Sequence, residues 1–474
     1  MMKNYLTVVF MLALFVLKPA SSKELDIETS HSGYGYFQFG QIMKGVYRSP
    51  ESNMNPEPVD HVWDQETAMG YGFFALVNDR TKVSLNSEIK LAHSFPQSRQ
   101  NDFETFQHSY QLLIYQADAV HYFGDPETPF LEVALGISPY KYNSEVRNLG
   151  EYLFRSEIYA PAIINHFDWP AAHLLGARVS GHFFNNRLNM DLWLTSEKQT
   201  VPEKDLSLSW IGSFDITSFL QIGGGVSFSR LFSMEKGIMD SIPLSEPELY
   251  GENMYITPGT DTIITLQQDT IIGKAEYIPF HGTKLMGRAT FDLRKLMGEP
   301  EIFGENDLKI YAEAAVLGTK NYSDFYIPIH KNNPTDSLTP YADLFDRVPM
   351  MFGINLPAFR ILDVLAFEFE YFKFNEMYPN SLRPREKQRE PSPLPEYEYQ
   401  DMKIDTVNNY PAELSPFKWS LYFSKNVFDC VNVIGMIGRD HIFLNSNVVT
   451  KTARQEMLVG EKHWRWALKV LFKI

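Results

Sequence analysis

Charged side chains recur at alternate positions of several apolar stretches, and this spacing could build a charged wall. In the stretch 284–292, for example, Lys284 and Arg288 alternate with Leu285 and Ala289. A side-chain period of two indicates an extended strand with one charged face and one apolar face. The cations found in this way are Arg178, Lys284, Arg288, Lys309, Arg465 and Lys469, and the acids are Glu88, Glu132, Asp191, Glu313, Glu368 and Glu370.

Opposed sets of cationic and anionic side chains are how wide pores select ions. A simpler interpretation is that a water-filled interior needs polar walls whatever the protein does, and that neighbours such as Arg288 and Glu313 only neutralise each other. Under either interpretation these residues, together with His182, are predicted to line a pore.

Other chemistry finds little support in the sequence. No G-x-S-x-G elbow, phosphate-binding loop, H-E-x-x-H helix or paired C-x-x-C motif occurs. His182 shares the polar face of 171–183 with Arg178 and Ser180, and a barrel hydrolase could use such a histidine. No partner nucleophile is recognisable, so lining an interior is the preferred role. The sequence predicts no catalytic residue, metal site or cofactor.

The elements that must position these residues are long strands. Alternation recurs in runs of about ten residues, the length that a tilted strand needs to cross a bilayer, whereas strands of soluble domains are usually about five or six residues long. The clearest runs are 81–93, 130–140, 187–196, 205–214, 218–231, 284–293 and 308–316. The last stretch, 463–474, alternates an apolar face beginning with Trp464 and Trp466 with a face carrying Arg465 and Lys469. A soluble sandwich would seldom sustain such strands over so many hairpins.

The connections alternate in length. Tight, turn-rich links are predicted at 78–80, 124–126, 185–187, 215–217, 357–362 and 428–430. Long connections are predicted at 44–66, 94–107, 141–169, 197–204, 319–349, 375–415 and 440–462. If 232–282 is one large excursion, the count is about 16 strands; an extra hairpin from 261–268 and 270–278 would give about 18. We prefer about 16, because Pro279, His281 and Gly282 interrupt that region.

The N-terminus is typical of an exported protein. Lys3, an apolar run over 5–17 and the small residues Ala20 and Ser22 predict a signal peptide at 1–22, which leaves 23–474 as a single domain. No later stretch has the roughly 18 consecutive apolar residues of a membrane-spanning helix. Cys430 is the only cysteine, so no disulfide within the chain can form.

Composition fits a barrel and excludes some partners. Aromatic residues make up 14% of the chain, yet mean hydropathy is −0.24, as expected when apolar and polar faces alternate. The net charge of −15 argues against nucleic-acid binding. Acidic residues concentrate in the predicted loops at 51–60, 235–252 and 390–405.

The signal peptide, the ten-residue alternation, the loop parity and the aromatic closing strand together resemble the porin-like outer-membrane β-barrels of Gram-negative bacteria. The resemblance implies an antiparallel up-and-down barrel with long extracellular loops, both termini periplasmic, outer-membrane lipid as its surroundings, and insertion machinery that recognises the C-terminal strand. Barrels of this class commonly end on an aromatic residue, whereas this chain ends Phe472-Lys473-Ile474. No named subfamily matches.

The function expected from this architecture is passive diffusion of small hydrophilic solutes, because about 16 strands enclose an aqueous channel. The acidic loops predict a weak cation preference that fades as salt screens their field. Two alternatives stay open: a non-conducting surface or adhesion barrel filled by 232–282 or 375–415, and a barrel enzyme acting on lipid or peptide. Association into a homo-oligomer is possible.

Overall fold

The computed structural model describes ten parts of the chain and eight short strands between them. The ten parts are 26–47, 57–95, 109–155, 172–196, 205–232, 282–319, 343–373, 415–441, 458 and 460–473. The short strands are β10 (Ser241–Pro243), β11 (Thr262–Leu266), β12 (Asp269–Gly273), β13 (Tyr277–Pro279), β16 (Ile327–His330), β17 (Asn333–Leu338), β20 (Pro384–Arg385) and β21 (Glu390–Pro391). The predicted signal peptide at 1–22 and most of the acidic loops lie outside these residues.

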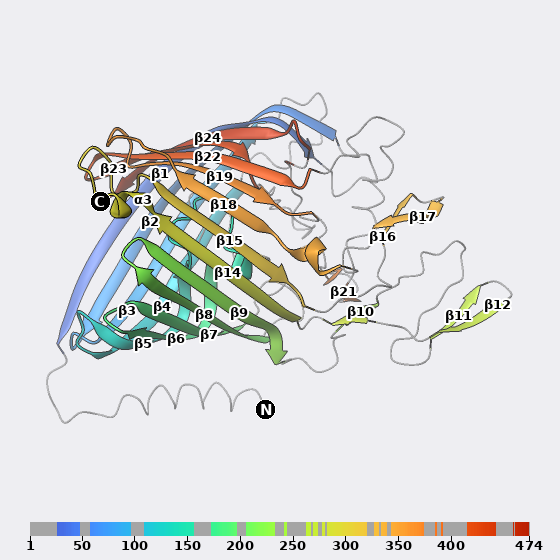
Figure 1. Ribbon diagram of the computed structural model, residues 1–474, viewed down its shortest axis with the longest axis horizontal. Helices are drawn as coiled ribbons and strands as arrows, with labels where there is room; N and C mark the ends of the chain where they lie inside the picture. The colour runs from blue at the N-terminus through green and yellow to red at the C-terminus, as the bar shows by residue number, and fades with distance from the viewer. Residues whose placement is uncertain are drawn as a thin grey trace.

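Sixteen antiparallel strands pair in chain order and close into a barrel (Figure 1). They are β1 (Ile27–Tyr47), β2 (Glu57–Val77), β3 (Thr81–Phe95), β4 (Ser109–Gly124), β5 (Pro129–Tyr140), β6 (Ala172–Phe183), β7 (Leu188–Ser196), β8 (Leu206–Thr217), β9 (Leu220–Phe232), β14 (Gly282–Asp292), β15 (Lys309–Leu317), β18 (Met350–Asn355), β19 (Val364–Tyr371), β22 (Phe417–Phe428), β23 (Val431–Arg439) and β24 (Trp464–Lys473). Pairing of β24 with β1 closes the sheet, with Lys469 opposite Gln38. The predicted fold class is therefore confirmed.

The strand count settles the choice between 16 and 18. β9 pairs directly with β14, so no described strand between Phe232 and Gly282 belongs to the closed sheet. The extra hairpin considered for this region does form, as β11 and β12, but these strands pair with each other in a sheet of their own. They lie away from the barrel wall in Figure 1.

Three connections differ from expectation. The tight link predicted at 215–217 lies at 218–219, because β8 continues to Thr217. β1 and β2 remain paired up to Tyr47 and Glu57, so the link predicted at 44–66 shrinks to 48–56. At the other end, where neighbouring links are as short as 218–219 and 429–430, strands β14 and β15 are joined by the long link 293–308. It begins with helix α3 (Leu293–Leu296), which Asp292 caps by accepting a hydrogen bond from the Lys295 amide at 2.9 Å. Leu293 is thus helical, whereas alternation placed it in a strand.

The two faces of the barrel have opposite polarity. Along β15 the residues Tyr311, Glu313, Ala315 and Leu317 are buried and the intervening ones are only half-buried. The inside of a closed sheet is its crowded face, so the buried positions point inward. Outward positions carry exposed apolar side chains, among them Met69, Ile89, Leu112, Leu192, Phe352 and Ile437.

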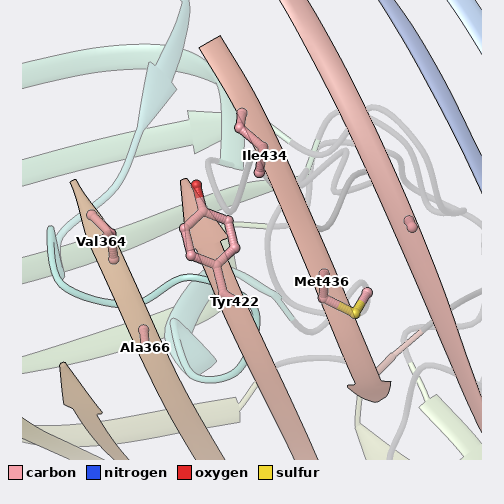
Figure 2. Close-up of a cluster of buried hydrophobic side chains, with 6 residues drawn as sticks. Val364, Ala366, Tyr422, Ile434 and Met436 are labelled. Atoms are coloured by element: carbon pink, nitrogen blue, oxygen red, sulfur yellow. The ribbon is translucent and has the colours of Figure 1, made fainter. Parts of the chain in front are cut away.

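Part of the inner wall is apolar. Val364 and Ala366 of β19, Tyr422 of β22, and Ile434 and Met436 of β23 form a buried cluster on neighbouring strands, together with Ala467 of β24 (Figure 2). Figure 2 shows Tyr422 between the side chains of the two flanking strands. A polypeptide segment inside the barrel contacts this wall, where the Arg147 guanidinium lies 5.9 Å from the centre of the Tyr422 ring.

Candidate functional site

Residues 141–155, which we call the lumen segment, continue from β5 and fold against the inner wall of the barrel. Its apolar side chains Val146, Leu149, Leu153 and Phe154 are fully buried. The segment ends in the single helical turn α2 (Tyr152–Arg155). Because its backbone has few hydrogen bonds of its own, its amide groups need acceptors from the wall.

Glu368 of β19 supplies the largest share of these acceptors. Its Oε1 accepts a hydrogen bond from the Arg147 amide at 2.5 Å, and its Oε2 accepts bonds from the Asn148 and Leu149 amides at 2.7 and 2.9 Å. The Tyr311 hydroxyl donates to the same carboxylate at 2.9 Å. Three consecutive backbone amides thus converge on one buried carboxylate, a strong arrangement because hydrogen bonds to an ionised acceptor exceed neutral ones.

Two further wall glutamates hold the rest of the segment. Glu313 of β15 accepts bonds from the Tyr142 hydroxyl at 2.6 Å and from the Tyr152 amide at 2.8 Å. Glu370 accepts a bond from the Tyr152 hydroxyl at 2.8 Å, and its other oxygen lies 2.6 Å from His441 Nε2. The three acids are at most 2% exposed.

Apolar and cationic contacts continue the docking towards β5, β7 and β14. Phe154 meets the Tyr140 ring edge-on at 5.6 Å, and Tyr140 in turn meets Trp193 at 5.1 Å. The Lys284 ammonium donates to the Leu153 carbonyl at 3.2 Å. Gly225 of β9 makes room for Leu153, since a Cβ there would lie 2.8 Å from Leu153 Cδ1.

One acid shapes the segment from within. Glu151 accepts hydrogen bonds from the amides of Asn143 at 2.5 Å and Tyr142 at 3.4 Å. Burial, followed by the negative charge of Glu313, raises the pKa of Glu151 to about 8. Lys141 works in the opposite direction and donates to the Val146 carbonyl at 2.6 Å.

The opposite stretch of inner wall, on β24, β1, β2 and β3, holds its charges in a different way; we call it the seam wall because it contains the closing strand pair. Arg465 donates two hydrogen bonds to Asp440, at 2.8 and 2.7 Å. The Lys90 ammonium lies 2.5 Å from Glu66. The Lys469 ammonium lies 4.2 Å from the centre of the Tyr36 ring, whose hydroxyl donates to Glu66.

The remaining residues of the predicted pore lining lie on β6, β7, β14 and β15. Arg178 contacts Glu132 at 3.3 Å. His182 lies 3.5 Å from the same glutamate and 2.7 Å from Asn189. The other contacts join Asp191 to the Tyr140 hydroxyl at 2.7 Å, Arg288 to Gln221 at 3.0 Å, and Lys309 to Glu145 at 3.0 Å.

The structure therefore gathers Lys284, Glu313, Glu368 and Glu370 around one polypeptide segment, which alternation alone did not foresee. Sequence reasoning treated 141–169 only as a long loop and missed the lumen segment. A signal was available: Tyr142, Val146, Leu149 and Leu153 are apolar or aromatic residues that a solvated loop would have little reason to carry.

Within the described ranges, no three His, Cys, Asp or Glu side chains gather closely enough to hold a metal ion. No helix in that part of the chain is long and apolar enough to cross a membrane.

Comparison with known proteins finds similar solved structures but no match in sequence. No protein-family model matches the chain, and no curated protein matches it. Among solved structures, the porin OmpF of Salmonella typhi, in complex with daunomycin, is 10% identical and aligns over 94% of this chain and 97% of its own, with a TM-score of 0.44. A double mutant of the Rhodopseudomonas blastica porin is 8% identical over 94% and 100% of the two chains, with a TM-score of 0.39. At these TM-scores the matches carry no argument of their own, and the closed 16-strand barrel is what agrees with the predicted porin-like architecture.

Proposed function

We propose that this protein is an outer-membrane pore for the passive diffusion of small hydrophilic solutes. The observation that carries the proposal is a 16-strand barrel whose outer face is apolar and whose inner face is charged. Met69 and Leu112 are each 72% exposed on the outer face, whereas Lys284, Glu368 and Lys469 are fully buried on the inner face. An extended apolar exterior suits lipid, and a barrel of this size encloses an aqueous channel.

The lumen segment is proposed to set the width of this channel. It is fixed to β15 and β19 by the contacts of Glu313, Glu368 and Glu370. Solutes would pass on its free side, where Ser144 is exposed and Lys141, Glu145 and Arg147 are half-exposed. A segment held by so many charge-assisted bonds narrows the passage for as long as it stays docked.

A weak cation preference is proposed for the pore. Many wall charges pair within the barrel, as in Lys90 with Glu66 and Arg178 with Glu132, so their outward field is small. The acidic loops would then set the bias at the mouth, and salt screens such a field within about 8 to 10 Å.

Planar lipid bilayers containing the purified protein test both parts of the proposal. We expect stepwise conductance in KCl, and reversal potentials that indicate a small cation preference at low salt that disappears at about 1 M salt. Absence of any conductance would favour the non-conducting surface barrel. Anion preference at low salt would show that wall residues, not the loops, control passage.

Localisation in the outer membrane, export by the signal peptide at 1–22 and insertion through the C-terminal strand belong to the same proposal. Cell fractionation and heat-modifiable migration on gels test them. A protein released intact by osmotic shock would contradict membrane insertion. The enzyme alternative would require lipid or peptide hydrolysis that is lost in His182→Ala.

A further inference from the structure

A cavity of about 410 Å³ lies beside the lumen segment, at the end of the barrel where the short links are. Its charged lining has three acids and three cations. The acids are Glu145, Asp215 and Asp292, and the cations are Arg187, Lys295 and Lys309. Hydroxyl groups of Ser144, Thr217 and Thr290 lie among them.

A second cavity, of about 700 Å³, adjoins the first. Asp292, Lys295 and Lys309 line both, so the two spaces are adjacent. The link 293–308 supplies most of the second wall. This link is much longer than its neighbours at the same end of the barrel, and its extra residues line the second cavity.

Some of the lining charges already have partners. Lys309 contacts Glu145 at 3.0 Å, Asp215 accepts a bond from Gln221 at 2.7 Å, and Arg294 lies 3.9 Å from Glu299. Each of these pairings leaves part of the group's hydrogen-bonding capacity unused, because a carboxylate accepts several bonds and an ammonium donates three.

Other lining groups have no partner among the described residues. This holds for the exposed side chains of Arg187 and Lys295. It also holds for two buried atoms, Glu145 Oε2 and Arg294 Nε, which make no hydrogen bond in the described part of the protein. Because these two atoms are buried, the groups that a bound solute could reach are the exposed side chains of Arg187 and Lys295 and the unused hydrogen-bonding capacity of the lining acids.

We propose that the two cavities form a binding site for small zwitterions, namely amino acids and short peptides. The ammonium group of such a solute would lie among Glu145, Asp215 and Asp292, and its carboxylate would lie near Arg187 and Lys295. A simple anion or cation would satisfy one set of charges only, and a neutral solute neither. This inference rests on the proposed pore and deepens it, since it names the class of solute that pauses beside the lumen segment.

Block of the KCl current by glycylglycine tests the site. We expect a concentration-dependent reduction of current by glycylglycine, and a much weaker one by N-acetylglycine, which keeps only the carboxylate, and by N-acetylglycinamide, which has neither charge. Equal block by N-acetylglycinamide would show mere obstruction, and equal block by N-acetylglycine would show an anion site. Either result would overturn the proposal.

A matched pair of variants locates the effect. Arg187→Gln combined with Lys295→Gln should weaken block by glycylglycine about tenfold or more, as expected for the loss of charge-assisted bonds. Arg80→Gln is the control, because Arg80 is an exposed arginine in another link at the same end and lines neither cavity. Equal loss in both would overturn the site.

Failure of the pore proposal and failure of the binding-site proposal can be told apart. Absence of open-channel current would contradict the pore, whereas normal current that glycylglycine does not block would contradict only the site. Calorimetric titration of the detergent-solubilised protein with glycylglycine provides a measure that needs no current. Binding to the wild type that is unchanged in the double variant would place the ligand elsewhere and overturn the assignment.

Discussion

Two stretches of the inner wall use the same kinds of charged residue for different purposes. On β15 and β19, the carboxylates of Glu313 and Glu368 accept hydrogen bonds from the lumen segment. On the seam wall, Glu66 pairs with a lysine of the neighbouring strand, and Asp440 pairs with an arginine of the closing strand. The first arrangement fixes a polypeptide inside the barrel, and the second fixes strands to one another. Removing a charge should therefore change conductance on one side and stability on the other.

The largest effect is expected for Glu368→Gln. The Gln side chain has one acceptor oxygen and one NH2 donor in place of two acceptor oxygens. At least one of the backbone N–H groups of Arg147, Asn148 and Leu149 would then face a donor instead of an acceptor. Each buried backbone N–H group left without an acceptor costs about 1–3 kcal/mol. We expect the lumen segment to detach from β19 and single-channel conductance to rise clearly above that of the wild type.

Glu88→Gln is the matched control for this change. Glu88 is a buried glutamate of the seam wall that accepts a bond from the Tyr34 hydroxyl at 2.5 Å and makes no described contact with the lumen segment. Its conductance should equal that of the wild type. Similar conductance in Glu368→Gln and Glu88→Gln would contradict the proposed role of the segment.

The second effect concerns the seam wall. Arg465→Met removes the cation that, against the opposing effect of burial, holds the pKa of Asp440 below its usual range, and it leaves a buried carboxylate unpaired. We expect a loss of about 3 kcal/mol or more in unfolding free energy, with conductance unchanged. Urea unfolding in lipid vesicles measures the loss.

Adding Asp440→Leu to Arg465→Met should restore much of that stability, because an apolar pair can replace a buried ion pair at little cost. A double variant no more stable than the single one would show that the pair does more than neutralise its own charges.

The third effect is a pH dependence confined to the lumen segment. The docked form of Glu151, with a pKa of about 8, binds its proton more tightly than a free carboxyl with a usual value of 4.5. Docking of the lumen segment is therefore most favoured below about pH 4.5 and weakens as the pH rises from about 4.5 to about 8. Conductance should increase between pH 5 and pH 9, and Glu151→Gln should abolish this increase. An equal increase in Glu151→Gln would assign the titration to another group.

The smallest effect is expected from a glycine of the segment. Gly150 has a φ of +95°, and a Cβ there would lie 2.7 Å from Met351 Cε. Gly150→Ala should cost about 1–2 kcal/mol in backbone strain and also push the segment from β18, with a modest rise in conductance. Gly298→Ala is the control, because Gly298 has a φ of +79° but nothing within 4 Å of an added Cβ. It should cause backbone strain without a steric contact and leave conductance unchanged.

Much of the barrel followed from the sequence. The alternation of Arg465 and Lys469 with Trp464 and Trp466 placed the closing strand and both of its faces, because a strand's side chains alternate regardless of what surrounds it. The interruptions at Pro279 and Gly282 favoured 16 strands over 18, and direct pairing of β9 with β14 confirms that choice. These features are local, and local features are what a periodic pattern records.

The tertiary structure alone decided what the inward charges do. The bonds from Arg147 to Glu368 and from Tyr142 to Glu313 join residues 221 and 171 positions apart in the chain. Alternation could place Glu313 and Glu368 on the inner face, but it could not tell a carboxylate facing water from one that accepts backbone amides. That difference depends on which distant segment enters the barrel, and only closure of the sheet brings the lumen segment within hydrogen-bonding distance of β15 and β19.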